Sequence, residues 1–160
     1  MVGLTVRILG YLELSERLAT AGQPTEEELA AVAAAGYETV VNLALPTSTG
    51  ALDDEAASVR RLGLEYVALP IDFEKPDVAT ALRFFDVLDR GRDRKLFVHC
   101  AANMRVSALV FAYRVARGQM SRDEATDDLE LIWVPNPTWA RYIEDVIAAA
   151  GAGSTKAESR

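Results

Sequence analysis

The amino-acid sequence predicts an α/β domain of three layers, in which a mostly parallel sheet is flanked by helices on both faces. Three apolar, strand-prone runs alternate with helix-compatible segments, as is typical of parallel sheets with helical connections. Of the 160 residues, 50% are hydrophobic, which is enough for one well-packed core. We therefore predict one domain over residues 1–150 and a small, polar, disordered tail over residues 151–160.

The first part of this domain predicts two helices and one strand. Thr25–Glu28 has the pattern of a capping box, and the alanine-rich stretch behind it predicts a helix over Glu26–Ala35. Val40–Leu45 is an apolar run suited to a fully buried strand. A loop over residues 46–51 then leads into a second predicted helix over residues 53–62.

The middle of the chain predicts two further strands with a helix between them. Leu64–Ile71 is apolar and strand-prone, and Pro76 suits the first turn of a helix. Apolar residues recur at helical spacing over residues 82–88. Lys95–Cys100 is the third predicted strand.

Helices account for the rest of the domain. Residues 106–116 predict a helix behind the third strand, and Ser121–Glu124 repeats the capping-box pattern. Asn136–Pro137 begins a last helix that we expect to end near Ala149.

The net charge of the chain limits the classes of molecule that we expect it to bind. A formal net charge of −7, with no cluster of basic and aromatic residues to offset it, predicts no binding of nucleic acid. A small phosphorylated ligand is still compatible with this charge, because backbone amides and one guanidinium can dominate inside a pocket.

The sequence predicts a cytoplasmic protein with no membrane span. No apolar run approaches the roughly 18 residues of a span, and Met1–Leu14 is interrupted by Arg7, Gly10 and Glu13. The chain has one cysteine and one histidine, which form neither an internal disulfide nor a zinc site of the usual kinds. We expect no metal and no cofactor.

Cys100 is the most informative residue of the chain. It lies between a predicted strand and a helix start, and Asp72 lies at the end of another strand. In a parallel sheet, ligands bind outside these strand ends. Backbone N–H groups and the helix dipole favour the nucleophilic thiolate there, and Arg105 supplies planar donors for an oxyanion such as phosphate. A buried, inert cysteine and a surface arginine are the alternatives.

The segment Val98–Ser107 resembles the signature of the cysteine-based protein tyrosine and dual-specificity phosphatases, which is His-Cys, five residues, Arg, and Ser or Thr. Here only four residues separate Cys100 from Arg105, and the usual loop glycine is missing. Ser107 keeps the register of the family's hydroxyl, so that Val106 stands where the arginine usually does.

Four other segments resemble one bacterial branch of that superfamily. They are an opening motif, a first core strand, an acid-bearing strand end and a closing segment, at Leu18–Pro24, Val40–Leu43, Tyr66–Asp72 and Trp133–Trp139. The resemblance extends from Leu18 to Ile147. It implies a dual-specificity-phosphatase-like fold and a hydrolase that acts, through a phosphocysteine, on a phosphorylated protein or small molecule.

The resemblance also implies roles within the loop. Cys100 is the expected nucleophile, Arg105 the expected phosphate ligand, and His99 the residue that orients the loop. Ser107 either donates to the leaving thiolate or caps the helix. The backbone amides that complete the phosphate cradle are those of Ala101, Ala102, Asn103, Met104 and Arg105.

A phosphatase of this kind needs a general acid for the leaving oxygen. Asp72 is the first candidate, because it lies 28 positions before Cys100, where related enzymes place their acid loop. Asp77 and Glu74 are alternatives, although an acid at the position of Asp77 also stabilises a helix start without any catalytic role.

Four further polar or aromatic residues have two interpretations each. Asn42 either bonds the catalytic loop or serves as a turn residue. Trp133, Asn136 and Trp139 either border the pocket or support the fold, and we expect at least one tryptophan in the core.

The shortened loop leaves two other functions open. Rhodanese sulfurtransferases hold a smaller persulfide in a six-residue loop that begins with cysteine, and Cys100–Arg105 has the same length. A catalytically silent domain would bind phosphate or phosphorylated partners through the same amides. The histidine, the serine in register, the acid and the flanking motifs favour the phosphatase.

Overall fold

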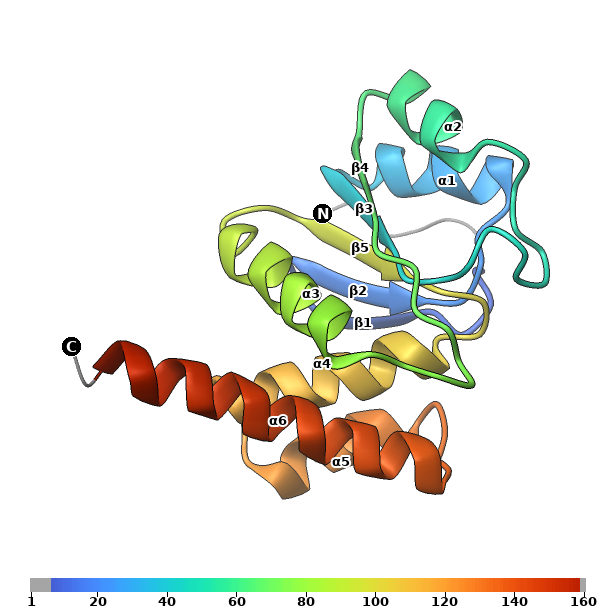
Figure 1. Cartoon of the computed structure of the whole chain (residues 1–160). Coiled ribbons are helices and arrows are strands. Elements are labelled where there is room, and N and C mark those ends of the chain that lie inside the picture. The colour runs from blue at the N-terminus through green and yellow to red at the C-terminus, as the bar shows by residue number, and fades with distance from the viewer. Residues whose placement is uncertain (1–6, 159–160) are drawn as a thin grey trace.

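The computed structural model describes the backbone of residues 7–158 and the side chains of residues 7–151. Residues 1–6 and 159–160 lie outside the described residues. The first six residues of the predicted domain and the last two of the predicted tail are therefore not described. A five-stranded sheet with the order β1-β2-β5-β3-β4 forms the middle layer between helices (Figure 1). The predicted three-layer α/β fold is confirmed.

Three strands are those predicted from the sequence, each shorter than expected. β3, β4 and β5 comprise Thr39–Asn42, Glu65–Ala68 and Leu96–His99, and β3 pairs in parallel with both others. Beyond these ends the chain turns into loops at one edge of the sheet. After β3, for example, the side-chain carbonyl of Asn42 accepts the N–H of Ala44 at 2.9 Å. The last residues of each predicted strand therefore form the loops of the site.

The sequence did not predict the two strands at the amino-terminal edge. β1, Leu12–Ser15, pairs antiparallel with β2, Leu18–Ala21, and β2 lies parallel to β5. Strands of four residues give a hydrophobic pattern too short to distinguish from a loop. Their presence places β5, which leads to Cys100, in the centre of the sheet.

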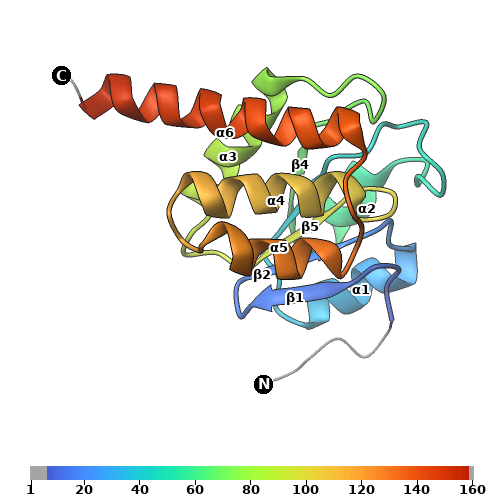
Figure 2. The ribbon, with the colours of Figure 1, turned by 90° about the horizontal axis from the view of Figure 1, so that it is seen from below.

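Helices cover both faces of the sheet. α1 and α2 lie on one face, and α3, α4, α5 and α6 lie on the other (Figures 1 and 2). Their bounds are, in order, Glu26–Ala34, Glu55–Arg61, Val78–Arg90, Met104–Ala116, Arg122–Glu130 and Pro137–Glu158. The capping boxes at Thr25 and Ser121 begin α1 and α5 as predicted. Asp77 is the N-cap of α3, so the prediction that Pro76 lies in the first turn is wrong.

Alternating side chains of the strands divide the core into two layers. Val40 and Phe97 pack in the layer under α1 and α2, whereas Val41 and Val98 pack in the layer under α3, α4 and α6. The central strand β5 is buried on both faces, as its continuous apolar sequence predicts. No described helix combines the length and the apolar character that crossing a bilayer requires.

The last helix differs from its prediction. α6 continues to Glu158, beyond the expected end at Ala149, so residues 151–158 are helical instead of disordered. Extending an existing helix is far easier than starting one, and alanine, lysine and glutamate in this stretch favour the extension despite Gly151 and Gly153. The end of α6 projects beyond the sheet (Figures 1 and 2).

The extension of α6 can be tested at Gly151. A Cβ added there would have no atom within 4 Å, so Gly151→Ala should raise the free energy of unfolding. We expect a gain of about 0.5–1 kcal/mol in urea denaturation, because alanine favours the helix. Gly63→Ala is the control and should destabilise the protein, since Gly63 has a φ of +83°. An unchanged stability of Gly151→Ala would contradict the extended helix.

Candidate active site

A pocket of about 390 Å³ lies at the edge of the sheet where β3, β4 and β5 end. Its lining comes from the loops that follow these three strands. It brings Asp72 together with Cys100 and Arg105, which follow it by 28 and 33 positions in the sequence. The pocket therefore lies where we expected the ligand site, outside the carboxyl ends of the parallel strands.

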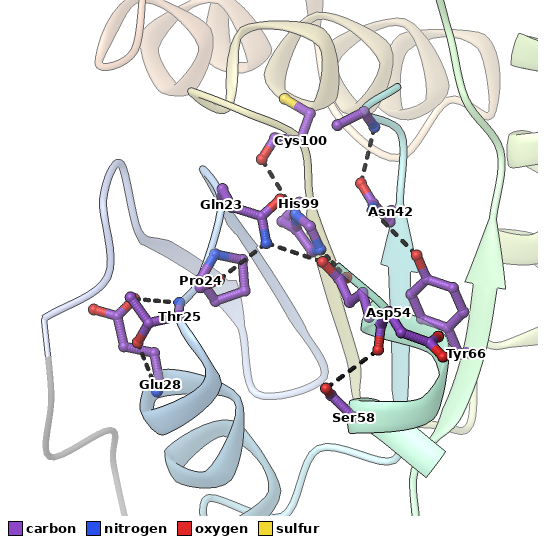
Figure 3. Close-up of polar contacts among 12 residues, drawn as sticks. Gln23, Pro24, Thr25, Glu28, Asn42, Asp54, Ser58, Tyr66, His99 and Cys100 are labelled. Atoms are coloured by element: carbon purple, nitrogen blue, oxygen red, sulfur yellow. Dashed lines mark hydrogen bonds and ion pairs between the residues drawn. The ribbon is translucent and has the colours of Figure 1, made fainter. Parts of the chain in front are cut away.

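Cys100 occupies the most enclosed part of this pocket. The residue is only 1% exposed, because the surrounding loop and core cover most of it, yet it borders the pocket. Its sulfur lies on the opposite side of the backbone from the ring of His99 (Figure 3). The N–H of Cys100 donates to the carbonyl of Ala21 at 3.2 Å, which fixes the start of the loop on β2.

The loop turns sharply into α4 at Asn103. This residue has a left-handed backbone with a φ of 65°, a conformation that asparagine tolerates better than most residues. Its side-chain amide donates to the carbonyl of Gly10 at 2.8 Å and to the hydroxyl of Thr20 at 2.9 Å. Asn103 thus holds the turn from beneath, and its side chain points away from the pocket. All of the predicted cradle residues except Asn103 line the pocket.

Backbone N–H groups of the loop are available to a ligand. Those of Ala101, Ala102, Met104 and Arg105 donate to no carbonyl within residues 7–158 and to no side chain within residues 7–151. The last two lie in the first turn of α4, where such groups have no partner inside the helix. Amides of this kind bind anions, and the helix dipole adds to the attraction.

Gly22 allows the end of β2 to approach this loop. A Cβ on Gly22 would lie 2.7 Å from the carbonyl oxygen of Ala101 and 3.2 Å from the Cα of Ala102. The N–H of Gln23 donates to the same carbonyl of Ala101 at 3.0 Å. The opening motif that contains Gly22 therefore supports the loop from the side.

The guanidinium of Arg105 is directed inward. Arg105 is 7% exposed, and its Nη1 donates to the carbonyl of Ile71 at 2.9 Å, while Nη2 lies 3.5 Å from the hydroxyl of Ser48. This placement excludes the alternative of a surface arginine. Because Ile71 precedes Asp72, the arginine joins the start of α4 to the loop that carries the first candidate acid. A guanidinium has five N–H donors, so several remain for an anion.

Of the three candidate acids, only Asp72 borders the pocket. One of its oxygens accepts the N–H of Glu74 at 2.9 Å, and its side chain is exposed. Asp77 instead caps α3, where its carboxylate accepts the N–H and the hydroxyl of Thr80 at 2.9 and 2.7 Å. Burial alone would raise the pKa of Asp77, but the hydrogen bonds from Thr80 outweigh it and lower the pKa. A carboxyl with a lowered pKa is poorly suited to donate a proton.

An aromatic cluster holds the loop that carries Asp72. Phe73 borders the pocket and stacks on Trp139 with ring centroids 5.5 Å apart. The indole N–H of Trp139 donates to the carbonyl of Phe73 at 2.8 Å, and the hydroxyl of Tyr142 donates to the carbonyl of Asp77 at 2.7 Å. Trp139 and Tyr142, both from α6, thus hold the backbone at Phe73 and at Asp77, on either side of residues 74–76.

The tryptophans and Asn136 of the closing segment support the fold. Trp139 is fully buried in the core, as expected for at least one tryptophan, and Trp133 packs against Phe73. Asn136 accepts the N–H of Trp139 at 2.9 Å at the start of α6. None of the three is among the residues that border the pocket.

The structure decides between the two interpretations of Asn42 and supports neither of those given for Ser107. The hydroxyl of Ser107 donates to the carbonyl of Met104 at 3.2 Å, and Ser107 is not among the residues around the pocket. Asn42 serves as a turn residue, since it bonds Ala44 and the hydroxyl of Tyr66, the latter at 3.1 Å.

Within residues 7–151, no three histidine, cysteine or acidic side chains gather as a candidate metal site.

Glu55 is the buried partner of His99, and the sequence did not predict it. Glu55 begins α2 and is 6% exposed, and its Oε2 lies 2.6 Å from Nε2 of His99, which is fully buried. Its other oxygen accepts the side-chain amide of Gln23 at 2.9 Å. Figure 3 shows Gln23 beside the histidine ring. An acid at a helix start normally only stabilises the dipole, so the local sequence gave no signal of this pairing.

The geometry determines how many protons the pair of His99 and Glu55 holds. Nδ1 of His99 lies 3.1 Å from the carbonyl oxygen of Cys100, which can only accept, so Nδ1 carries a proton. The contact between Nε2 and the carboxylate needs a second proton. Two protons shared by an imidazole and a carboxylate give a pair with no net charge. The pair therefore orients the carbonyl of Cys100 without adding charge to the buried layer.

Comparison with protein families supports the resemblance seen in the sequence. The model of a family described as DSP-PTPase phosphatase fused to NAD+ kinase matches residues 11–136. A "Beta-lactamase hydrolase-like protein" of Xylella fastidiosa, found in two strains, is 31% identical over 122 residues. That match covers 71% of this chain but only 27% of the relative, so the chain spans about a quarter of that protein.

Solved structures show the same fold. A phosphatase-like DUF442 protein of Shewanella putrefaciens CN-32 superposes with a TM-score of 0.80 at 28% identity, covering 90% of this chain and 95% of its own. A kinase associated phosphatase, crystallised with its catalytic-site cysteine replaced by serine, superposes with a TM-score of 0.75 at 15% identity. The latter match covers 91% of this chain and 98% of that one, and it shows the fold alone.

The pairing of His99 with Glu55 predicts a large effect on stability. Glu55→Ala leaves a buried histidine without its partner, and we expect a loss of about 3 kcal/mol in urea denaturation at neutral pH. Glu55→Gln keeps a hydrogen-bonding group and should lose less. Glu65→Ala is the matched control, because Glu65 forms an exposed ion pair with Arg94 and should change stability by less than about 1 kcal/mol. Equal effects of the two alanine variants would contradict the buried pair.

Proposed function

Because the chain belongs to the family of DSP-PTPase phosphatases fused to NAD+ kinase, we propose that it hydrolyses phosphomonoesters through a covalent intermediate on Cys100. The observation that carries the proposal is the single pocket bordered by Cys100, Arg105 and Asp72. A nucleophile, a phosphate ligand and an acid are the three groups that this reaction requires.

In the first step, the thiolate of Cys100 attacks phosphorus in line with the leaving oxygen. A sulfur–phosphorus bond forms and the phosphorus–oxygen bond to the leaving group breaks. Asp72 donates its proton to that oxygen, which departs as an alcohol or phenol. The loop amides and Arg105 bind the other phosphoryl oxygens, and their attraction strengthens as charge spreads over these oxygens in the transition state.

In the second step, water hydrolyses the phosphocysteine. Asp72, now a carboxylate, accepts a proton from the attacking water, and the sulfur leaves as a thiolate. One difficult displacement is thus replaced by two easier ones. His99 is a positioning residue in this scheme, since it acts on the loop through the carbonyl of Cys100.

Arg105 links substrate binding to the position of the acid. Its bond to the carbonyl of Ile71 holds the residue next to Asp72 while other N–H groups of the guanidinium bind phosphate. This double contact supports a working site in spite of the shortened loop. A lysine has no planar fork and cannot make both contacts in the same way.

The first functional prediction concerns Cys100 and Arg105. The protein should release p-nitrophenolate from p-nitrophenyl phosphate, Cys100→Ser should abolish the release, and Arg105→Lys should lower kcat about a hundredfold or more. Thiocyanate formation from thiosulfate and cyanide, without phosphate release, would show a sulfurtransferase instead. Phosphate binding with neither turnover would show a silent binding domain.

The second functional prediction concerns the acid. Asp72→Asn should slow hydrolysis of alkyl phosphates about 10²- to 10⁴-fold, and that of p-nitrophenyl phosphate much less, because a good leaving group needs little protonation. Asp77→Asn is the matched control and should retain activity, since asparagine also caps helices. Equal slowing of both substrates in Asp72→Asn would exclude Asp72 as the general acid.

A further inference from the structure

A second groove continues from the catalytic pocket towards the start of α1. It has a volume of about 850 Å³ and shares Thr49, Ala101 and Ala102 with the pocket. A ligand whose phosphate lies over the loop amides therefore reaches the groove directly. We propose that this groove binds the polypeptide that carries the phosphate, and that it selects chains with lysine or arginine beside the phosphorylated residue. The inference rests on the proposed phosphatase function.

One part of the groove is apolar. Leu9, Pro24 and Leu52 are among its lining residues, and Leu9 is 63% exposed. A large exposed leucine beside a pocket offers apolar surface that a bound chain would cover. Side chains that flank a phosphorylated residue are of the right kind to do so, whereas inorganic phosphate or a small phosphate ester would leave this surface exposed.

The charge of the groove is entirely negative. Among the residues that the structure describes, Glu26 and Glu27 are the only charged ones that line the groove, and neither forms an ion pair there. The carboxylate of Glu26 accepts the hydroxyl of Ser58 at 2.7 Å, while the side chain of Glu27 makes no hydrogen bond within the described residues. The catalytic pocket attracts an anion and the adjoining groove attracts a cation, so the preferred ligand carries both.

This combination of charges favours a basic phosphopeptide over other phosphorylated molecules. Nucleotides and inositol phosphates bring further negative charge, which Glu26 and Glu27 repel. An anionic membrane surface is repelled in the same way, and the net charge of −7 adds to that repulsion. In a peptide with arginine or lysine next to the phosphorylated residue, a negative and a positive group lie as close together as two neighbouring side chains.

Glu28 provides a matched control for Glu27. Both lie in the first turn of α1, where acidic residues stabilise the helix start. Glu28 is engaged in the capping box, where its Oε1 accepts the N–H of Thr25 at 2.9 Å, and it is not among the lining residues of the groove. Glutamine preserves a capping box, so Glu28→Gln and Glu27→Gln each remove one charge from the same turn.

The experiment measures binding and turnover of two phosphotyrosyl peptides. They differ only at the two positions on each side of the phosphotyrosine, which are arginine in one peptide and glutamate in the other. Fluorescence polarisation gives their dissociation constants on the Cys100→Ser protein. We expect the arginine peptide to bind about tenfold more tightly at low ionic strength, with a smaller ratio at high salt. In that background, Glu27→Gln should reduce the ratio about threefold, and Glu28→Gln should leave it nearly unchanged. Without the serine substitution, kcat/KM should follow the same order.

Several results would overturn the proposal. Equal binding of the two peptides, binding of neither, equal effects of Glu27→Gln and Glu28→Gln, or stronger binding of phosphatidylserine vesicles or inositol phosphates would each do so. Turnover of p-nitrophenyl phosphate tests the phosphatase function separately, and Glu27→Gln should leave that turnover unchanged. Loss of this function with the arginine preference retained would refute the enzyme and keep the groove as a phosphopeptide site.

Discussion

The central constraint on this molecule is the sharp turn that leads from β5 into α4. Cys100–Arg105 spans six residues, and in that length the chain leaves a buried strand, presents its amides and starts a helix. The turn depends on a left-handed residue, Asn103, whose amide is anchored underneath, and on Gly22, whose missing side chain lets β2 approach. Beneath it, His99 and Glu55 form a buried pair that fills its layer without net charge. The arrangement of the pocket follows from these supports.

The pocket shows how an acidic protein can attract an anion. The surface as a whole is negative, but the groups around Cys100 are unpaired amides, the start of α4 and the guanidinium of Arg105. Electrostatic attraction acts over short distances in water and is stronger where water is excluded, so these local groups dominate inside the pocket. The acidic groove beside it has the opposite preference. In our proposal, the two neighbouring regions together select ligands by the arrangement of their charges and not by total charge.

The loop that carries Asp72 is held at both ends by contacts from distant parts of the chain. Arg105 binds the carbonyl before Asp72, and Trp139 and Tyr142 of α6 bind carbonyls that follow it. Asp77 belongs to this support, because its carboxylate caps α3 and its lowered pKa keeps it ionised. Two nearby acids thus have different surroundings. One is committed to a helix end, and the other is open to the pocket.

The sequence by itself determined the fold class, three of the strands and the starts of α1, α5 and α6, because hydrophobic periodicity and helix caps are local properties of the chain. It also proposed Cys100, Arg105 and Asp72 as candidate site residues from motif spacing and strand ends, and these three residues border one pocket. It missed β1, β2 and Glu55, and it could not choose between the interpretations of Asn42 and Asp77 or foresee that α6 continues to Glu158. Tertiary structure decided these, because a hydrogen-bond partner or a pocket wall is set by residues that are distant in sequence and meet only when the layers pack.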